Sequence, residues 1–171
     1  MEVYDAIKGR RSVRRFRQDT VESEKIEALK EALVSAPSAG NLRMRRFYFV
    51  FNEDLRKKLS TAAFGQMFIC RAPLVVVACA DMGIEEYYGK RGVELYAIQD
   101  AAASVENMLL MAHSLGLGSV WVGAFSEAET ARLLGLPERL KPVAMVPVGY
   151  PEVVPKGPPR GSVEDQVVVI G

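Results

Sequence analysis

Arginines surround a serine close to the N-terminus, in the segment Arg10–Phe16, which reads RRSVRRF. Guanidinium groups bond phosphate oxygens in pairs, and a serine hydroxyl can donate one further hydrogen bond to the same group. A phosphomonoester carries about 1.5 to 2 negative charges at neutral pH, so a few such cations are enough to bind one. The segment therefore predicts a phosphate site. A solvated basic surface is the alternative interpretation of the same spacing.

A second arginine cluster, Arg43, Arg45 and Arg46, lies further along the N-terminal part of the chain. Residues 1–60 contain 14 Lys and Arg against 9 Asp and Glu, whereas residues 61–171 contain 8 against 12. The net charge of +1 therefore hides a basic first third. The clusters Arg10–Arg17 and Arg43–Arg46 leave open a nucleic-acid-binding module, a function of another class. Because the rest of the chain is acidic and has no recognised nucleic-acid-reading motif, we expect no nucleic acid among the partners.

The loop Pro37–Asn41, with the sequence PSAGN, consists of small residues directly after a predicted helix. Small side chains let a flat ligand approach the backbone closely, and Ser38 and Asn41 offer donors and acceptors to the edge of a ring. The loop is therefore a candidate surface for a planar ligand. An ordinary helix-terminating turn is the alternative interpretation of its composition.

Side chains for self-sufficient catalysis are scarce. His113 is the only histidine, and Cys70 and Cys79 are the only cysteines. These counts exclude a Ser-His-Asp or Cys-His machinery, a disulfide scaffold and a histidine- or cysteine-rich metal site. The longest apolar run, Ala72–Ala80, is far below the roughly 20 residues that cross a bilayer, and no signal-peptide stretch is visible. We expect a metal-free, soluble protein of the cytoplasm with no membrane partner.

The pattern of apolar residues, caps and breakers predicts one domain, with a core over residues 1–150 and an extended arm over 151–171. Predicted helices cover Glu2–Gly9, a stretch capped by Thr20 and ending near Pro37, Asn52–Ala63, Val93–Leu115 and a stretch capped by Ser126 and ending at Gly135. Predicted strands cover Arg46–Phe51, Pro73–Ala80, Ser119–Gly123, Pro142–Gly149 and Gln166–Ile170. The continuous apolar run of Pro73–Ala80 is typical of a strand buried on both faces.

Two of these elements have more apolar surface than a small monomer covers. The helix Val93–Leu115 is apolar nearly all round, which indicates a central helix or a subunit interface. The strand Gln166–Ile170 follows the Pro- and Gly-rich stretch Pro151–Gly161 and has no obvious partner strand in its own chain. An arm that reaches a partner subunit explains such a strand.

Taken together, these motifs resemble the nitroreductase family of FMN-dependent oxidoreductases. The matching stretches follow the family's order along nearly the whole chain: Arg10–Phe16, Pro37–Asn41, Ala72-Pro73, Asp100 with Asn107, Gly116–Gly123 and Pro147–Pro151. The resemblance implies an α+β fold, a mostly antiparallel sheet flanked by helices, in a homodimer that exchanges its C-terminal arms. It also implies two FMN sites at the subunit interface. The activity it implies is hydride transfer from NAD(P)H to FMN, followed by reduction of a nitroaromatic or quinone acceptor in a ping-pong mechanism.

The resemblance also assigns cofactor-binding residues, and each match is to a family motif. Arg10, Arg11 and Ser12 match positions that hold the FMN phosphate, and Arg14 matches a cation beside the N1/O2 edge of the flavin. The matches to the loop that packs on the isoalloxazine from the partner subunit are Pro37, Ser38, Ala39, Gly40 and Asn41. Val122 and Gly123 match the stretch whose backbone N–H reaches flavin N5, and Lys156 and Arg160 match basic positions that close over the phosphate. No catalytic side chain is assigned, because the flavin supplies the chemistry.

The chain departs from the family pattern in two places. Many relatives continue the small loop with Gln, Pro and Trp, where this sequence has Arg43, Met44 and Arg45. There is also little room between Gly65 and Arg91 for the insertion that shapes the substrate pocket of larger members. The departures leave open other chemistry on the same fold, such as dehalogenation or flavin breakdown, and a flavin carrier without turnover.

Overall fold

A four-stranded antiparallel sheet forms the middle layer of the molecule. The computed structural model describes residues 1–171. The strands are β1 (Arg45–Val50), β2 (Leu74–Asp81), β3 (Gly118–Ser119) and β4 (Leu140–Gly149), and they lie in the order β1-β2-β4-β3. The α-helices are α1 (Val3–Gly9), α2 (Ser23–Val34), α3 (Glu53–Ala62), α4 (Phe68–Arg71), α5 (Glu85–Arg91), α6 (Ala97–Ser114) and α7 (Glu127–Leu134). Short 3₁₀ turns cover Ala39–Asn41 and Met82–Ile84, and a π-helical turn covers Gly92–Tyr96.

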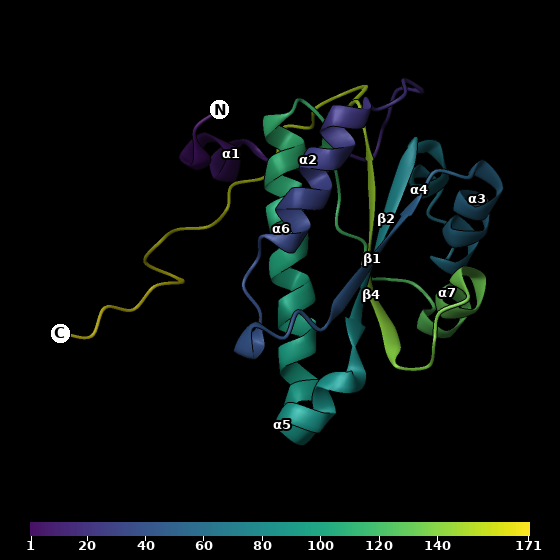
Figure 1. The fold of residues 1–171 in the computed structure, drawn as a ribbon. Helices are drawn as coiled ribbons and strands as arrows, with labels where there is room; N and C mark the ends of the chain where they lie inside the picture. Colours follow the sequence, from purple (N-terminus) through teal and green to yellow (C-terminus); the bar gives the residue numbers. More distant parts are fainter.

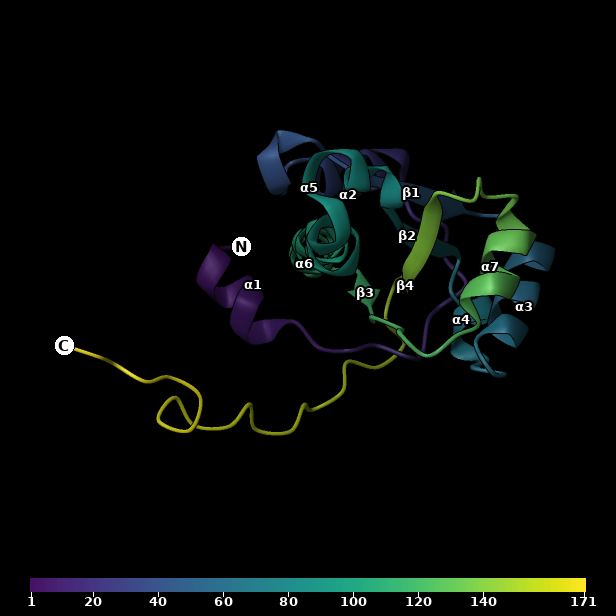
Figure 2. The ribbon, with the colours of Figure 1, turned by 90° about the horizontal axis from the view of Figure 1, so that it is seen from below.

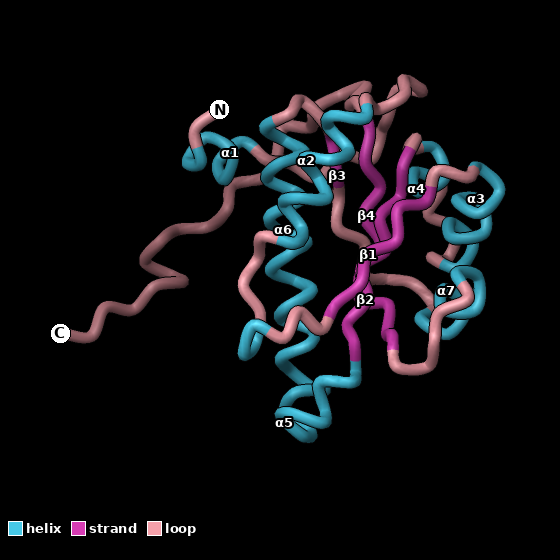
Figure 3. The backbone as a smooth tube through the Cα atoms, viewed as in Figure 1, coloured by secondary structure: helices cyan, strands magenta, loops and turns pink.

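Helices cover both faces of the sheet, with α2 and α6 on one face and α3, α4 and α7 on the other (Figures 1 and 3). Every residue of β2 is buried, and its side chains alternate between the two faces. Val76 and Ala78 join the core beneath α2 and α6, whereas Val77 and Cys79 join the core beneath α3 and α7. The predicted strand buried on both faces is thereby confirmed, as is the α+β class with an antiparallel sheet.

Local capping signals place several helix ends where the sequence predicts them. The side chain of Asn52 accepts a hydrogen bond of 2.9 Å from the backbone N–H of Leu55, and that of Ser126 accepts one of 3.3 Å from Glu129. The predicted cap at Thr20 is wrong, because α2 begins only at Ser23. Burial of Val21 in the core beneath α2 keeps the preceding backbone out of the helix.

The long predicted helix Val93–Leu115 is shorter in the structure. Its α-helical part is α6, which crosses the full height of the sheet (Figure 1) and is seen end-on in Figure 2. A π-helical turn occupies Gly92–Tyr96 and joins α6 to α5, so the backbone hydrogen bonding changes before Ala97. One side of α6 packs on the core, while Ile98 on the other side is 37% exposed in the single chain.

The C-terminal arm leaves the sheet after β4, passes α1 and then extends away from the layered body of the molecule (Figures 1 and 2). The predicted strand Gln166–Ile170 is not formed in the single chain: Gln166 lies in a turn, and the residues after it have no regular secondary structure. Val168, Val169 and Ile170 are each more than 80% exposed. None of the helices is both long enough and apolar enough to cross a membrane.

Candidate functional site

The arginine-serine segment after α1 is held in an extended conformation beside β3. Ser12 pairs with Ser119 in a parallel bridge, and the backbone N–H of Val13 donates a 2.9 Å hydrogen bond to the carbonyl of Ser119. Val13 is buried against Gly118, where a side-chain Cβ would lie 2.8 Å from it. Because neighbouring residues of an extended chain face opposite ways, burial of Val13 turns Ser12 and Arg14 outward.

Six of the predicted cofactor-binding residues line one cavity of about 360 Å³. The N-terminal segment supplies Arg10, Arg11, Ser12 and Arg14, and the arm supplies Lys156 and Arg160. Figure 2 shows the segment after α1 running beside the arm. The structure therefore brings together residues from opposite ends of the chain.

Two contacts hold the arm against the segment. The Arg160 guanidinium donates a 2.7 Å hydrogen bond to the backbone carbonyl of Arg10. Gly157 lies so close to Arg11 that a Cβ there would meet its Nε at 2.3 Å. The arm therefore passes directly over the Arg11 side chain, which would have to shift if residue 157 carried a Cβ.

The positive charge of this cavity is poorly compensated within the chain. The one ion pair is between Arg10 Nε and Glu106 Oε1, at 3.8 Å, and the Glu106 side chain is half exposed. Lys156 and Arg160 make no ion pair. Burial, and then the charges of Arg10 and of neighbouring Arg11, lower the pKa of His113. An anion with about two charges would offset this repulsion.

The small-residue loop lies at the other end of α6. The backbone N–H of Ala39 donates a 2.9 Å hydrogen bond to Asp100 Oδ1, near the start of the helix. Gly9, just before the arginine segment, packs against His113 near the end of the same helix. His113 follows Asp100 by about 13 residues, which is roughly 20 Å along a helix axis. Within one chain the structure thus does not bring Pro37–Asn41 to the arginine cavity.

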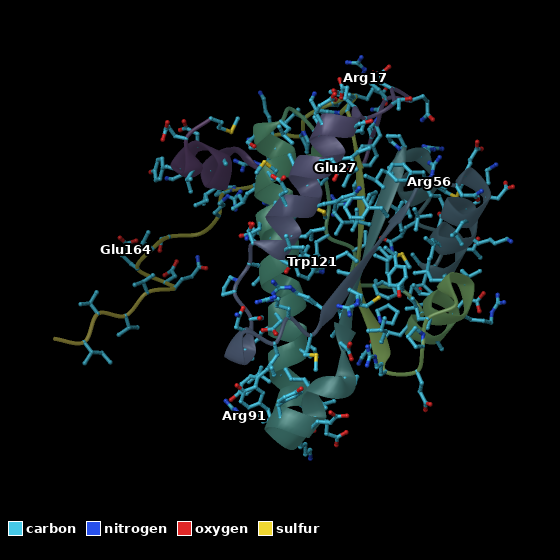
Figure 4. The ribbon with its side chains drawn as sticks, viewed as in Figure 1. Arg17, Glu27, Arg56, Arg91, Trp121 and Glu164 are labelled. Carbon is cyan, nitrogen blue, oxygen red and sulfur yellow. The ribbon has the colours of Figure 1, made fainter.

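The two residues predicted to offer a backbone N–H differ in their hydrogen bonding. The N–H of Val122 donates to the carbonyl of Met145 at 2.9 Å, and the reverse bond completes the bridge. Val122 is buried and its N–H is occupied within the chain, so the predicted contact of the stretch Val122–Gly123 with a flavin, which stays a prediction, needs another donor. Gly123 is exposed and its N–H makes no hydrogen bond within the chain. Gly123 is therefore the available donor, next to the half-exposed Trp121 shown in Figure 4.

Residues around α4 also reach this region, and no sequence motif points to them. Gln66 donates from its side-chain amide to the carbonyl of Ala124 at 2.9 Å, which ties the turn before α4 to the residue after Gly123. The guanidinium carbon of Arg14 lies 5.8 Å from the centre of the Phe68 ring. Both contacts join residues more than 50 positions apart, beyond the reach of any local spacing pattern.

The family model described as the nitroreductase family matches residues 7–150. The chain belongs to the nitroreductase family. It is 36% identical to an Archaeoglobus fulgidus nitroreductase relative and 34% identical to one from Methanothermobacter thermautotrophicus, both provisionally named NADH dehydrogenase/NAD(P)H nitroreductase. Each match covers 88% of this chain, and it covers 86% and 78% of the two relatives respectively.

The nitroreductase fold is shared with solved structures as well. The structure of an FMN-dependent nitroreductase from Clostridium difficile R20291 is 25% identical and superimposes with a TM-score of 0.85. That match covers 98% of this chain and 99% of the other. The shared fold therefore extends over nearly the whole length of both chains.

Proposed function

We propose that this nitroreductase is an NAD(P)H-dependent FMN oxidoreductase, active as a homodimer, that reduces nitroaromatic or quinone acceptors by a ping-pong mechanism. The observation that carries the proposal is the cavity in which Arg10, Arg11, Ser12 and Arg14 meet the arm residues Lys156 and Arg160. The names of the relatives supply the cofactor and the electron donor: one is called FMN-dependent and two are called NAD(P)H nitroreductases.

The residues present fit FMN on physical grounds. The cavity gathers five cationic side chains and has one distant carboxylate partner, which suits the dianionic phosphate of FMN. Arg14 would stabilise the negative charge that a reduced flavin carries at its N1–C2=O edge. The free backbone N–H of Gly123 would donate to the flavin ring. Bound FMN supplies hydride acceptance and donation, and the protein supplies binding, orientation and electrostatics.

The dimer is proposed because several apolar surfaces lack a cover in the single chain. A cavity of about 500 Å³ lies between α1, α2 and α6 and is lined by apolar residues that include Val3, Leu110 and Met111. The arm, residues 151–171, ends in the exposed run Val167–Ile170. A second copy would cover both features. It would also bring its own Pro37–Asn41 loop to the cofactor whose phosphate this chain holds.

Colour and reduction test the proposed activity. The purified protein, or the protein after incubation with FMN and desalting, is expected to be yellow. Anaerobic NADH or NADPH should bleach it, and a quinone or nitroaromatic should restore the colour. Initial rates at several fixed acceptor concentrations should give parallel double-reciprocal lines.

Each alternative gives a different result. A yellow protein that neither nicotinamide bleaches is a flavin carrier. A protein that bleaches but transfers nothing to either acceptor performs other flavin chemistry. A colourless protein that does not take up FMN and binds nucleic acid with steep salt dependence contradicts the proposal.

A further inference from the structure

Arg45 is a buried arginine at the start of β1, and it stands where the sequence departs from the family's usual loop continuation. Its residue is only 4% exposed. One nitrogen of its guanidinium, Nη1, donates to the carbonyl of Pro37 at 2.8 Å and to that of Asp100 at 3.2 Å. The other, Nη2, donates to the carbonyl of Ala36 at 2.6 Å. One side chain therefore joins the end of α2, the small-residue loop and the first turns of α6.

Asp100 holds the same loop from the helix side. It is 6% exposed, and its Oδ1 accepts the hydrogen bond from the backbone N–H of Ala39. Its other oxygen, Oδ2, is buried without a hydrogen-bond partner. Burial lowers the pKa of Arg45, and the carboxylate of Asp100 acts in the opposite direction. Arg45 thus holds the carbonyl of Pro37, and Asp100 holds the N–H of Ala39, two residues further along the loop.

The loop needs such support because its backbone is strained. Asn41 and Arg43 have φ angles of 56° and 57°, in the left-handed region that side chains other than glycine disfavour. Gly40, with φ of 53°, precedes them. Residues in such conformations persist only when the surrounding structure determines them fully. In this loop, the anchoring contacts before Gly40 come from Arg45 and Asp100.

We infer that Arg45 is a positioning residue of this nitroreductase: together with Asp100 it clamps Pro37–Asn41 in the conformation that packs on the flavin of the partner subunit. This inference rests on the proposed function, because the loop's role toward the flavin belongs to that proposal. A lysine could not replace Arg45, since its ammonium is a single point of donation, whereas the planar guanidinium reaches several carbonyls at once.

Arg56 supplies a matched control. It is also a buried arginine, 9% exposed, and its guanidinium donates to backbone carbonyls that include those of Phe51 and Cys70. It lies on the α3 side of the sheet, away from α6 (Figure 4). Arg45→Lys and Arg56→Lys therefore remove comparable sets of buried hydrogen bonds. Only the hydrogen bonds of Arg45 reach the loop Pro37–Asn41.

Hydrogen–deuterium exchange on the apoprotein tests the clamp without any cofactor. Arg45→Lys is expected to accelerate exchange of the Ala39 amide by about tenfold, the effect of losing one net hydrogen bond. Arg56→Lys should leave that amide at the wild-type rate. Asp100→Leu removes the acceptor and also the unpartnered Oδ2, and gives a second variant if Arg45→Lys does not fold.

The FMN-loaded protein tests what the clamp does. Arg45→Lys should lower kcat/KM for the acceptor by about tenfold and change the flavin's visible circular dichroism, with FMN affinity within about threefold of wild type, because the phosphate is held elsewhere. Arg56→Lys should change neither readout. An unchanged Ala39 amide, unchanged flavin readouts, or the same changes in Arg56→Lys would each overturn the inference. A wild-type protein that does not bind FMN would instead overturn the proposed function, and with it the cofactor half of this inference.

Discussion

Arg160 and Arg10, 150 positions apart in the sequence, are joined by a 2.7 Å hydrogen bond from the guanidinium of one to the backbone carbonyl of the other. This bond places a cation of the C-terminal arm over the cationic segment of the N-terminus. The like charges of the cationic side chains that line this one cavity repel one another unless an anion lies between them. The contact between Arg160 and Arg10 is therefore the arrangement expected of a phosphate-binding site. The first two predictions test this.

Removing the cations on the N-terminal side should abolish FMN retention. The double variant Arg10→Ala/Arg14→Ala loses two charge-assisted hydrogen bonds, about 1.5 to 3 kcal/mol each, so FMN affinity should fall on the order of 100-fold or more. Flavin content after dialysis and a fluorescence titration measure it. Arg132→Ala, which removes an exposed arginine paired with Glu129 on α7, is the control and should bind FMN normally. Full flavin content in the double variant would show that the assignment is wrong.

The arm should be protected from trypsin by the FMN phosphate. Trypsin cleaves after lysine and arginine, and Lys156 and Arg160 are each followed by glycine. FMN should slow cleavage at both bonds by about tenfold, because the ligand stabilises the closed arrangement that binds it. Riboflavin has the same ring system without the phosphate and should protect far less. Equal protection by the two flavins would contradict a phosphate contact with the arm.

Stability at alkaline pH should depend on Cys79. Burial in β2 raises the pKa of its thiol to about 12, whereas an unfolded cysteine ionises near pH 8.5. Above about pH 9 the unfolded chain loses this proton and the folded one keeps it, so the free energy of unfolding falls by about 1.4 kcal/mol per pH unit. Urea unfolding of wild type and Cys79→Ala at several pH values measures the difference. The Cys79→Ala variant should lack this part of the decline, and parallel curves would refute the prediction.

A side chain at position 40 should destabilise the protein for two separable reasons. Its φ of 53° is strained for alanine, at about 1 kcal/mol, and a Cβ would lie within 2.4 Å of the Tyr88 hydroxyl oxygen. Gly135 has φ of 60° with nothing within 4 Å, so Gly135→Ala measures the backbone cost alone. Gly40→Ala should destabilise the protein more than Gly135→Ala, and adding Tyr88→Phe should recover the excess. If the two alanine variants lower the unfolding temperature equally, the Tyr88 side chain moves aside at no cost and the predicted clash is absent.

The sequence by itself determined the local features of this nitroreductase. The caps at Asn52 and Ser126 and the two-sided burial of β2 follow from side chains within a few residues of one another, so their signals are complete in a short window. The composition of the arginine segment Arg10–Phe16, which predicts a phosphate site, is likewise complete in a short window. The Thr20 cap was mispredicted because burial of Val21, a tertiary contact, overrides the local preference.

Only the tertiary structure decided how these parts meet. It placed Lys156 and Arg160 over the N-terminal arginines, and it gave the N–H of Val122 to Met145, leaving that of Gly123 free. It also turned Arg45 from a member of a basic cluster into a buried link between α2, the loop and α6. Each outcome depends on strand pairing or packing between segments far apart in the chain, and the free energy of such contacts is not expressed in any local pattern of residues.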